Sequence, residues 1–254
     1  MERWIGRVAL VTGASAGIGT AIARDLVCLG MKVVGCSRNI EKIQKLSDDL
    51  KNEKGSLTAI RCDLSKEEDI INMFKTIKSN ESLRGVDVCI NNAGLAHNAP
   101  ILSGRTEQWR EMLDVNVMAV TICTREAFQS MKERNVDDGH IMFINSMSGH
   151  RVVPNTATHF YAATKFAVTA LMESTRQELR ELKSHIRVTG VSPGLVETEF
   201  ALRMNKDEEK AKALYSTIEC LKGKDISDAV VFALQAPSHC EINDVHIRPT
   251  EQTS

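Results

Sequence analysis

The chain has 254 residues, enough to bury a large core, and its 43% hydrophobic and 26% charged residues are typical of a globular protein. Its 32 Lys and Arg residues nearly balance its 33 Asp and Glu residues, and the net charge of −1 argues against a nucleic-acid partner. Because no run of about 18 uncharged apolar residues occurs, we expect no membrane span.

The seven cysteines and seven histidines show no spacing typical of a metal site. Neither Cys-x-x-Cys nor His-Glu-x-x-His occurs, so we expect no metal. Most of the cysteines lie in apolar stretches, where a thiol packs as a small hydrophobic group. Together with the odd number of cysteines and the lack of an apolar leader, this predicts a reducing, cytoplasmic location.

Short stretches rich in β-branched residues alternate with amphipathic stretches of helical length. The former predict strands at residues 7–11, 32–36, 56–61, 86–90, 140–144, 186–191 and 244–247. The latter predict helices at residues 17–29, 39–53, 66–79, 106–134, 158–182 and 224–235. This alternation predicts one α/β domain over residues 1–254, a doubly wound, seven-stranded parallel sheet flanked by helices. Residues 195–222 are less regular and are predicted to form a helical insertion or lid.

The first predicted strand runs into a glycine-rich turn, Thr12-Gly-Ala-Ser-Ala-Gly-Ile-Gly19, and then into the first predicted helix. Glycines permit a tight turn, and a helix N-terminus offers free N–H groups and partial positive charge. A pyrophosphate binds in such a place, although a glycine-rich loop is also often only a turn. We predict that a dinucleotide contacts Gly13, Ser15, Gly17, Ile18 and Gly19.

The second predicted strand ends in Cys36-Ser-Arg-Asn39, where NAD-binding sheets commonly carry an acidic residue for the ribose 2′-hydroxyl. Arg38 stands there instead, and a guanidinium can bind a 2′-phosphate through charge-assisted hydrogen bonds. We therefore predict that Arg38 and Asn39 contact NADP(H), with NAD(H) as the alternative cofactor. The other interpretation of Arg38 is an arginine on a solvated loop.

Polar residues also follow the third and fourth predicted strands. Asp63 and Leu64 close the third strand and would place a carboxylate near the adenine amino group. Asn92, in Asn91-Asn-Ala-Gly94, closes the fourth, either as a turn that stabilises the sheet or as a wall of a cofactor cleft. Because open parallel sheets bind ligands beyond the carboxyl ends of their strands, we predict that these residues contact the cofactor.

Two further polar residues have the chemistry of a reaction site. Ser146 follows the fifth predicted strand and can donate a hydrogen bond to a substrate carbonyl oxygen; we favour it over Ser148. Asn116 stands inside the helix predicted at 106–134, where asparagine fits poorly. It marks either a local break that binds water or a tolerated polar residue.

Tyr161 and Lys165 lie four residues apart in the helix predicted at 158–182, so their side chains share a face. A phenol normally keeps its proton until about pH 10. A nearby ammonium lowers that pKa toward the range useful for acid–base catalysis. The spacing also arises by chance on helix surfaces, so the pair gains meaning only beside a cofactor site.

Taken together, these motifs resemble those of the short-chain dehydrogenase/reductase family, over essentially the whole chain. The motifs are the turn at 12–19, the Asn-Asn-Ala-Gly at 91–94, Asn116, Ser146, Tyr161-x-x-x-Lys165 and Pro193-Gly194. The resemblance implies a Rossmann fold. It implies that Ser146, Tyr161 and Lys165 are catalytic, that Tyr161 and Lys165 also contact the cofactor, and that Asn116 joins a proton relay through a water. It further implies that Val196 and Thr198 orient the nicotinamide carboxamide. By the same resemblance, helices 106–134 and 158–182 would form a homodimer or homotetramer.

Three longer stretches resemble a group of family members that reduce 3- and 17-ketosteroids with NADPH: residues 123–139, 145–151 and 248–252. The insect relatives of that group are described as farnesol or alcohol dehydrogenases. The expected function is therefore NADP(H)-dependent interconversion of a small hydrophobic ketone or aldehyde and its alcohol, in particular by a carbonyl or ketosteroid reductase. The alternatives are an isoprenoid alcohol dehydrogenase and a non-catalytic NADP(H)-sensing protein. An apolar substrate cavity is expected from Val152, Val153, Pro154, Leu202, Met204 and Leu214.

Overall fold

The computed structural model describes residues 1–205 and 207–253, with side chains at all of these positions except 205, 210, 211 and 214. Seven strands of this described chain form one parallel sheet in the order β3-β2-β1-β4-β5-β6-β7. The strands are β1 Val8–Thr12, β2 Lys32–Ser37, β3 Ser56–Arg61, β4 Val88–Asn91, β5 His140–Ile144, β6 Arg187–Pro193 and β7 Asp244–Ile247. The predicted sheet is thereby confirmed, with strand ends displaced by no more than one or two residues.

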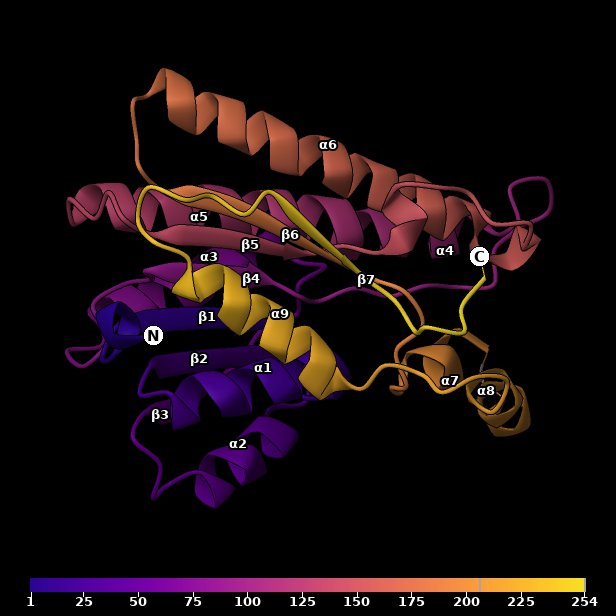
Figure 1. The fold of residues 1–254 in the computed structure, drawn as a ribbon, viewed down its shortest axis with the longest axis horizontal. Coiled ribbons are helices and arrows are strands. Elements are labelled where there is room, and N and C mark those ends of the chain that lie inside the picture. Colours follow the sequence, from indigo (N-terminus) through magenta and orange to yellow (C-terminus); the bar gives the residue numbers. More distant parts are fainter. Residues whose placement is uncertain (206, 254) are drawn as a thin grey trace.

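Helices cover both faces of the sheet (Figure 1). One face carries α1 Gly17–Cys28, α2 Ile40–Asp49 and α9 Gly223–Gln235; the other carries α3 Glu67–Ser79, α5 Ala119–Glu133 and α6 His159–Glu181. Alternate strand residues point into the two apolar cores that result, so that Ala9 and Val11 of β1 face one core while Val8 and Leu10 face the other. Burial on both faces explains why the strands are almost continuously apolar.

The helix predicted at 106–134 is interrupted. It consists of α4 Thr106–Leu113, a π-helical turn at Asp114–Met118, and α5. Asn116 lies buried in the π-helical turn, at the position where the sequence predicts a break. A π-helical turn inserts an extra residue into the helix and often lies at a functional site. The helix α2 is shorter than predicted, because residues 51–54 after it are exposed and have no core to pack against.

The segment predicted as a helical insertion contains two short helices, α7 Phe200–Asn205 and α8 Glu208–Tyr215, which pack on each other. Part of the predicted segment, including Lys206, lies outside the described residues. The base of the segment is closed by backbone hydrogen bonds from Leu221 N to Leu195 O (3.1 Å) and from Glu197 N to Leu221 O (2.8 Å). In Figure 1, α7 and α8 lie at the same end of the molecule as the C-terminus.

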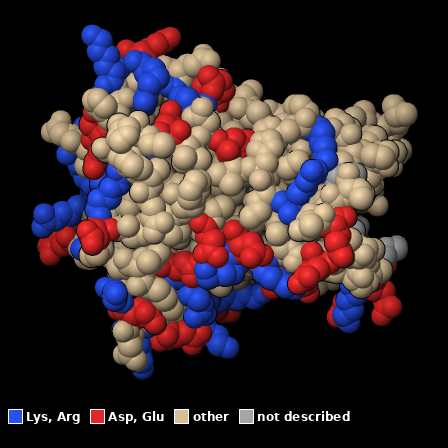
Figure 2. All heavy atoms as spheres, viewed as in Figure 1, with Lys and Arg blue, Asp and Glu red and all other residues tan. Residues whose placement is uncertain are grey.

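The surface carries charges of both signs. In the view of Figure 2, acidic and basic side chains are interspersed along the left and lower margins, and the central part is largely uncharged. This distribution agrees with the near-neutral net charge of −1. None of the described helices combines the length and the apolarity that crossing a bilayer requires.

Candidate active site

The turn between β1 and α1 leaves the N-terminus of α1 open to a phosphate. Ala16, which precedes the helix, has no side chain that could cap it, and Gly17 has a φ of +55°, in the left-handed region. A Cβ on Gly19 would overlap the carbonyl oxygen of Gly13 and would lie 2.5 Å from Nδ2 of Asn92. The tight turn and the free helix N–H groups fit a dinucleotide pyrophosphate.

Beside this turn lies a cavity of about 470 Å³. Most of the residues predicted to contact the cofactor line it: Gly13, Ser15, Gly17, Ile18, Arg38, Asn39, Asp63, Leu64, Asn92 and Thr198. Gly19 lies buried beneath the turn. Asn39 and Asn92 also hold the backbone, since Asn39 Oδ1 accepts from Lys42 N at the start of α2 (3.4 Å) and Asn92 Nδ2 donates to Thr12 O (2.8 Å).

Arg38 and Asp63 place opposite charges on the rim of this cavity. Burial acts to raise the pKa of Asp63, but hydrogen bonds from the Ser65 hydroxyl and amide outweigh it and, with the charge of Arg38, hold the pKa below its usual value. Asp63 is therefore an anion at neutral pH. Within the described chain the Arg38 guanidinium makes no ion pair shorter than 4 Å, so it remains available to an anionic ligand.

A second cavity, of about 610 Å³, contains the residues expected to react. It is lined by Ser146, Tyr161, Lys165 and Val196, and it shares Ile18, Asn92, Gly94, Thr198 and Phe200 with the first cavity. The Ser146 hydroxyl lies close enough to the Tyr161 phenol to act on its pKa. Lys165 Nζ donates to Ile144 O at the end of β5 (2.9 Å). The structure thus brings the predicted serine, tyrosine and lysine together where the two cavities join.

Burial shifts the pKa values of the two titratable groups in opposite directions. It raises the pKa of Tyr161 to about 12, a rise that the Ser146 hydroxyl opposes only in part, and it lowers the pKa of Lys165 to about 8. The sequence predicts that the Lys165 ammonium lowers the phenol pKa, and its Nζ lies 5.8 Å from the ring centroid. Burial of the phenol acts against that effect.

Asn116 lines neither cavity among the described residues but lies behind the reacting groups. Its Nδ2 donates to Leu95 O (2.8 Å) and Thr164 Oγ1 (3.0 Å), and its Oδ1 accepts from Leu95 N (2.9 Å). One lone pair of Oδ1 is left for a water. Gly94 lies beside both polar groups, since a Cβ there would be in ordinary contact with that oxygen (3.5 Å) and with Lys165 Nζ (3.8 Å).

The expected apolar walls are present in part. Val153, Pro154 and Met204 line the second cavity, whereas Val152 and Leu202 are 62% and 40% exposed; the side chain of Leu214 lies outside the described part. The Phe200 ring of α7 packs edge-on against Tyr161, with centroids 5.6 Å apart. Sequence reasoning missed three residues that line this cavity, and no local pattern indicates them: Glu251, Gln252 and Thr253.

Replacement of Lys165 by Met should raise stability near neutral pH. Between pH 8 and 10.5 Lys165 keeps its proton in the unfolded chain but has released it in the folded protein. The free energy of unfolding of the wild type therefore increases with pH across that window, and the destabilisation by Lys165 is greatest below pH 8. One unit of pKa difference corresponds to about 1.4 kcal/mol, so removal of the buried charge should raise the free energy of unfolding by about 3 kcal/mol. The lost hydrogen bond to Ile144 reduces this gain. We expect the Tm at pH 7 to rise by about 4 °C.

Thermal unfolding at pH 7 and pH 10 checks this expectation. The advantage of Lys165→Met should shrink at pH 10, where the wild-type lysine is itself largely neutral. Lys75→Met, on the exposed side of α3, is the matched control and should change the Tm little at either pH. A lower Tm for Lys165→Met at pH 7 would show that the buried ammonium stabilises the fold.

Comparison with known proteins agrees with this geometry. The family model described as short chain dehydrogenase matches residues 7–209. The chain is 62% identical to dehydrogenase/reductase SDR family member 11 of Gallus gallus, in an alignment that covers the whole of each protein. It is 44% identical to farnesol dehydrogenase of Aedes aegypti, in an alignment that covers 98% of each protein. A closed serine dehydrogenase complexed with NADP⁺ superposes with a TM-score of 0.88 at 32% identity, over 97% of this chain and 96% of the other. The protein therefore belongs to the short-chain dehydrogenase/reductase family of NAD(P)-dependent oxidoreductases.

Proposed function

We propose that the protein is an NADP(H)-dependent reductase of hydrophobic ketones and aldehydes, with ketosteroids as its preferred class of substrate. The observation that carries this proposal is the convergence of Ser146, Tyr161 and Lys165 on one cavity, where it joins the predicted cofactor cavity. A carbonyl in the second cavity has a hydroxyl pair within reach on one side and the predicted cofactor cavity on the other.

Each of these residues has a defined task in carbonyl reduction. The nicotinamide, when bound, supplies the hydride that the carbonyl carbon accepts. Ser146 donates a hydrogen bond to the carbonyl oxygen as that oxygen gains negative charge, and Tyr161 transfers its phenolic proton to it. Lys165 uses one of its three N–H donors on Ile144 O, which leaves two for the ribose and for a water beside Asn116.

The walls of the second cavity support a mostly apolar substrate that carries a second oxygen. Val153, Pro154 and Met204 provide apolar surface. Arg151 lines the same cavity, and its Nε is buried without a hydrogen-bond partner among the described residues. The rest of the guanidinium can still donate hydrogen bonds. A ketosteroid with an oxygen at each end of its ring system would supply both the reacting carbonyl and an acceptor for the Arg151 side chain.

Turnover of a carbonyl panel tests the activity. With NADPH, we expect kcat/KM to be higher for 3- and 17-ketosteroids than for α-dicarbonyls or isoprenoid aldehydes. Tyr161→Phe removes the proton donor, so we expect it to lower kcat at least about 100-fold. NADPH binding, followed by fluorescence, should change little. Ser148→Ala, which alters the serine that we do not favour, is the matched control and should retain most of the activity.

The outcomes of the panel separate the alternatives. Preference for farnesal and farnesol would replace the ketosteroid proposal by an isoprenoid alcohol dehydrogenase, as the mosquito relative's name suggests. Tight NADPH binding without reduction of any carbonyl would contradict an enzymatic role and favour a cofactor-sensing protein. Substantial turnover by Tyr161→Phe would contradict the proton donor.

Arg38 supports the preference for NADP(H), because it lines the first cavity without a competing ion pair in the described chain. We expect Arg38→Leu to raise the Kd of NADPH by about 10- to 100-fold, the worth of charged hydrogen bonds to a 2′-phosphate. The Kd of NADH should stay nearly constant, since NADH lacks that phosphate. Calorimetric titration with both cofactors measures this, and Arg24→Leu on the exposed side of α1 is the control. Equal losses for both cofactors would contradict the role of Arg38.

Exposed apolar side chains on the helices predicted to associate support a homodimer or homotetramer. Met118 and Phe166 are 51% and 42% exposed and lie in the π-helical turn and α6. We expect Phe166→Lys to lower the mass measured by light scattering. Ile5→Lys, at an exposed residue near the N-terminus, should leave the mass unchanged. A monomeric wild-type protein would contradict the proposal.

A further inference from the structure

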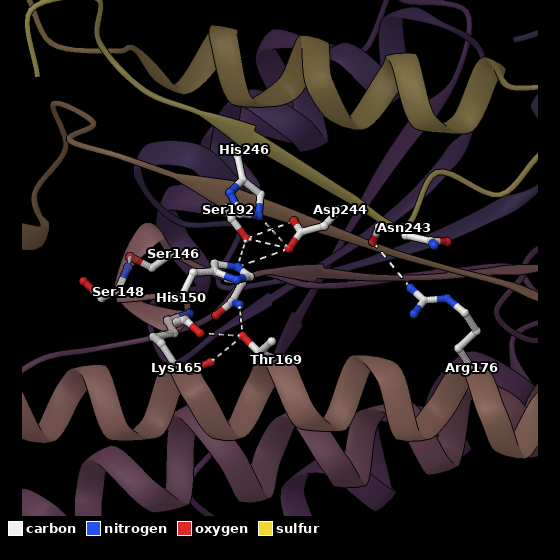
Figure 3. A network of polar contacts seen from close by, with 12 residues as sticks. Ser146, Ser148, His150, Lys165, Thr169, Arg176, Ser192, Asn243, Asp244 and His246 are labelled. Carbon is white, nitrogen blue, oxygen red and sulfur yellow. Dashed lines mark hydrogen bonds and ion pairs between the residues drawn. The ribbon is translucent and has the colours of Figure 1, made fainter. Parts of the chain in front are cut away.

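Two histidines and an aspartate converge at the edge of the sheet formed by β6 and β7. His150 follows the short turn after β5, whereas Asp244 and His246 belong to β7. Figure 3 shows both imidazole rings beside the Asp244 carboxylate, and their centroids are 4.3 Å apart. The Asp244 Oδ2 lies 3.1 Å from His150 Nε2 and 3.2 Å from His246 Nε2. One ligand atom from each residue lies within 4.8 Å of the other two.

The strand geometry builds this cluster. Asp244 and His246 are two residues apart in β7, so they share a face of the sheet. Their register partners in β6 are Gly190 and Ser192. Gly190 leaves room for the carboxylate, because a Cβ there would lie 2.9 Å from Asp244 Oδ1.

The buried hydroxyl of Ser192 holds the cluster from behind. Ser192 Oγ lies 2.9 Å from Asp244 Oδ1 and 3.0 Å from His150 Nε2. It therefore restrains both the carboxylate and the ring. An ion bound to His150 Nε2 would replace the contact of Ser192 with that nitrogen, and Ser192 would keep its hydrogen bond to Asp244 Oδ1, the kind of outer bond that orients a metal ligand.

Two imidazole nitrogens and one carboxylate oxygen are a donor set that Zn²⁺ binds, with a water or hydroxyl as the fourth ligand. In a tetrahedral zinc site with bonds of about 2.0–2.1 Å, neighbouring ligand atoms are about 3.3 Å apart. The two Nε2–Oδ2 separations already approach this value. Since the three ligand atoms lie within 4.8 Å of one another, small side-chain movements would let a single ion contact all three.

The cluster is open to ions from solvent but separate from the reaction site. The side chains of His150 and Asp244 are about one-fifth exposed, and that of His246 is 46% exposed. Among the described residues that line the two cavities, none of the three appears. Sequence spacing could not indicate the site, because one ligand comes from a loop and the other two from a strand far along the chain.

We propose that His150, Asp244 and His246 bind one Zn²⁺ ion that fastens β7 to the loop after β5. This loop carries Ser146 and is already tied to α6, because Thr169 Oγ1 donates to Gly149 O (2.9 Å). The ion stabilises the fold and does not contact the reacting groups.

Calorimetric titration of the full-length protein with Zn²⁺, after removal of metals by a chelator, tests the proposal. We expect one equivalent to bind with a Kd of about 1 µM or lower. Thermal unfolding should show a Tm that rises with the Zn²⁺ concentration. Co²⁺ should bind in competition with Zn²⁺ and give visible absorption bands of a site of low coordination number, whereas Mg²⁺ should not compete.

Substitutions locate the ion. His150→Gln and His246→Gln should each raise the Kd for Zn²⁺ at least about tenfold, and their Tm values in chelator show whether they fold. His185→Gln is the matched control, because His185 pairs with Asp137 on the surface without a second histidine in the described contacts. Zinc that binds equally well to both variants would belong to other groups, such as the free cysteines, and would overturn the proposal. Failure of the wild type to bind one equivalent would also overturn it.

Discussion

The buried ammonium of Lys165 is the constraint on which the candidate site depends. A cation removed from water must find hydrogen-bond acceptors, and here the carbonyl of Ile144 accepts at the end of β5. This bond holds the face of α6 that carries Tyr161 beside the segment that carries Ser146. The reacting groups are thus positioned by a sheet end and a long helix rather than by a loop alone, which gives the precise placement that catalysis requires.

Strand positions and strand-end motifs could be predicted from the sequence because both are local features. The bounds of β3 and β5 agree with the prediction to the residue, since apolar β-branched stretches end there at polar turns. In a parallel sheet the carboxyl ends of all strands lie at the same edge. Motifs that follow different strands can therefore be predicted to lie close together even when no contact between them is known. The sequence left Asn116 as either a local break in its helix or a tolerated polar residue, and sequence alone does not indicate a π-helical turn.

Features that depend on contacts between distant segments could not be predicted. Glu251, Gln252 and Thr253 line the second cavity because the chain end folds back over the segment after β6, where Gln252 Oε1 accepts from Leu195 N (2.9 Å). No periodicity encodes that return. The effect of burial on the pKa of Tyr161 could not be predicted for a related reason. Helical spacing shows that an ammonium is near, but it does not show how much water the fold removes from the phenol.

The two opposite pKa shifts set the protonation states of the candidate site. Burial disfavours the charged form of each group, so Tyr161 remains a neutral phenol until about pH 12, while Lys165 remains an ammonium below about pH 8. At neutral pH both groups therefore carry their protons. Because burial stabilises the protonated phenol over its conjugate base, the fold itself keeps Tyr161 in the form that can donate a proton.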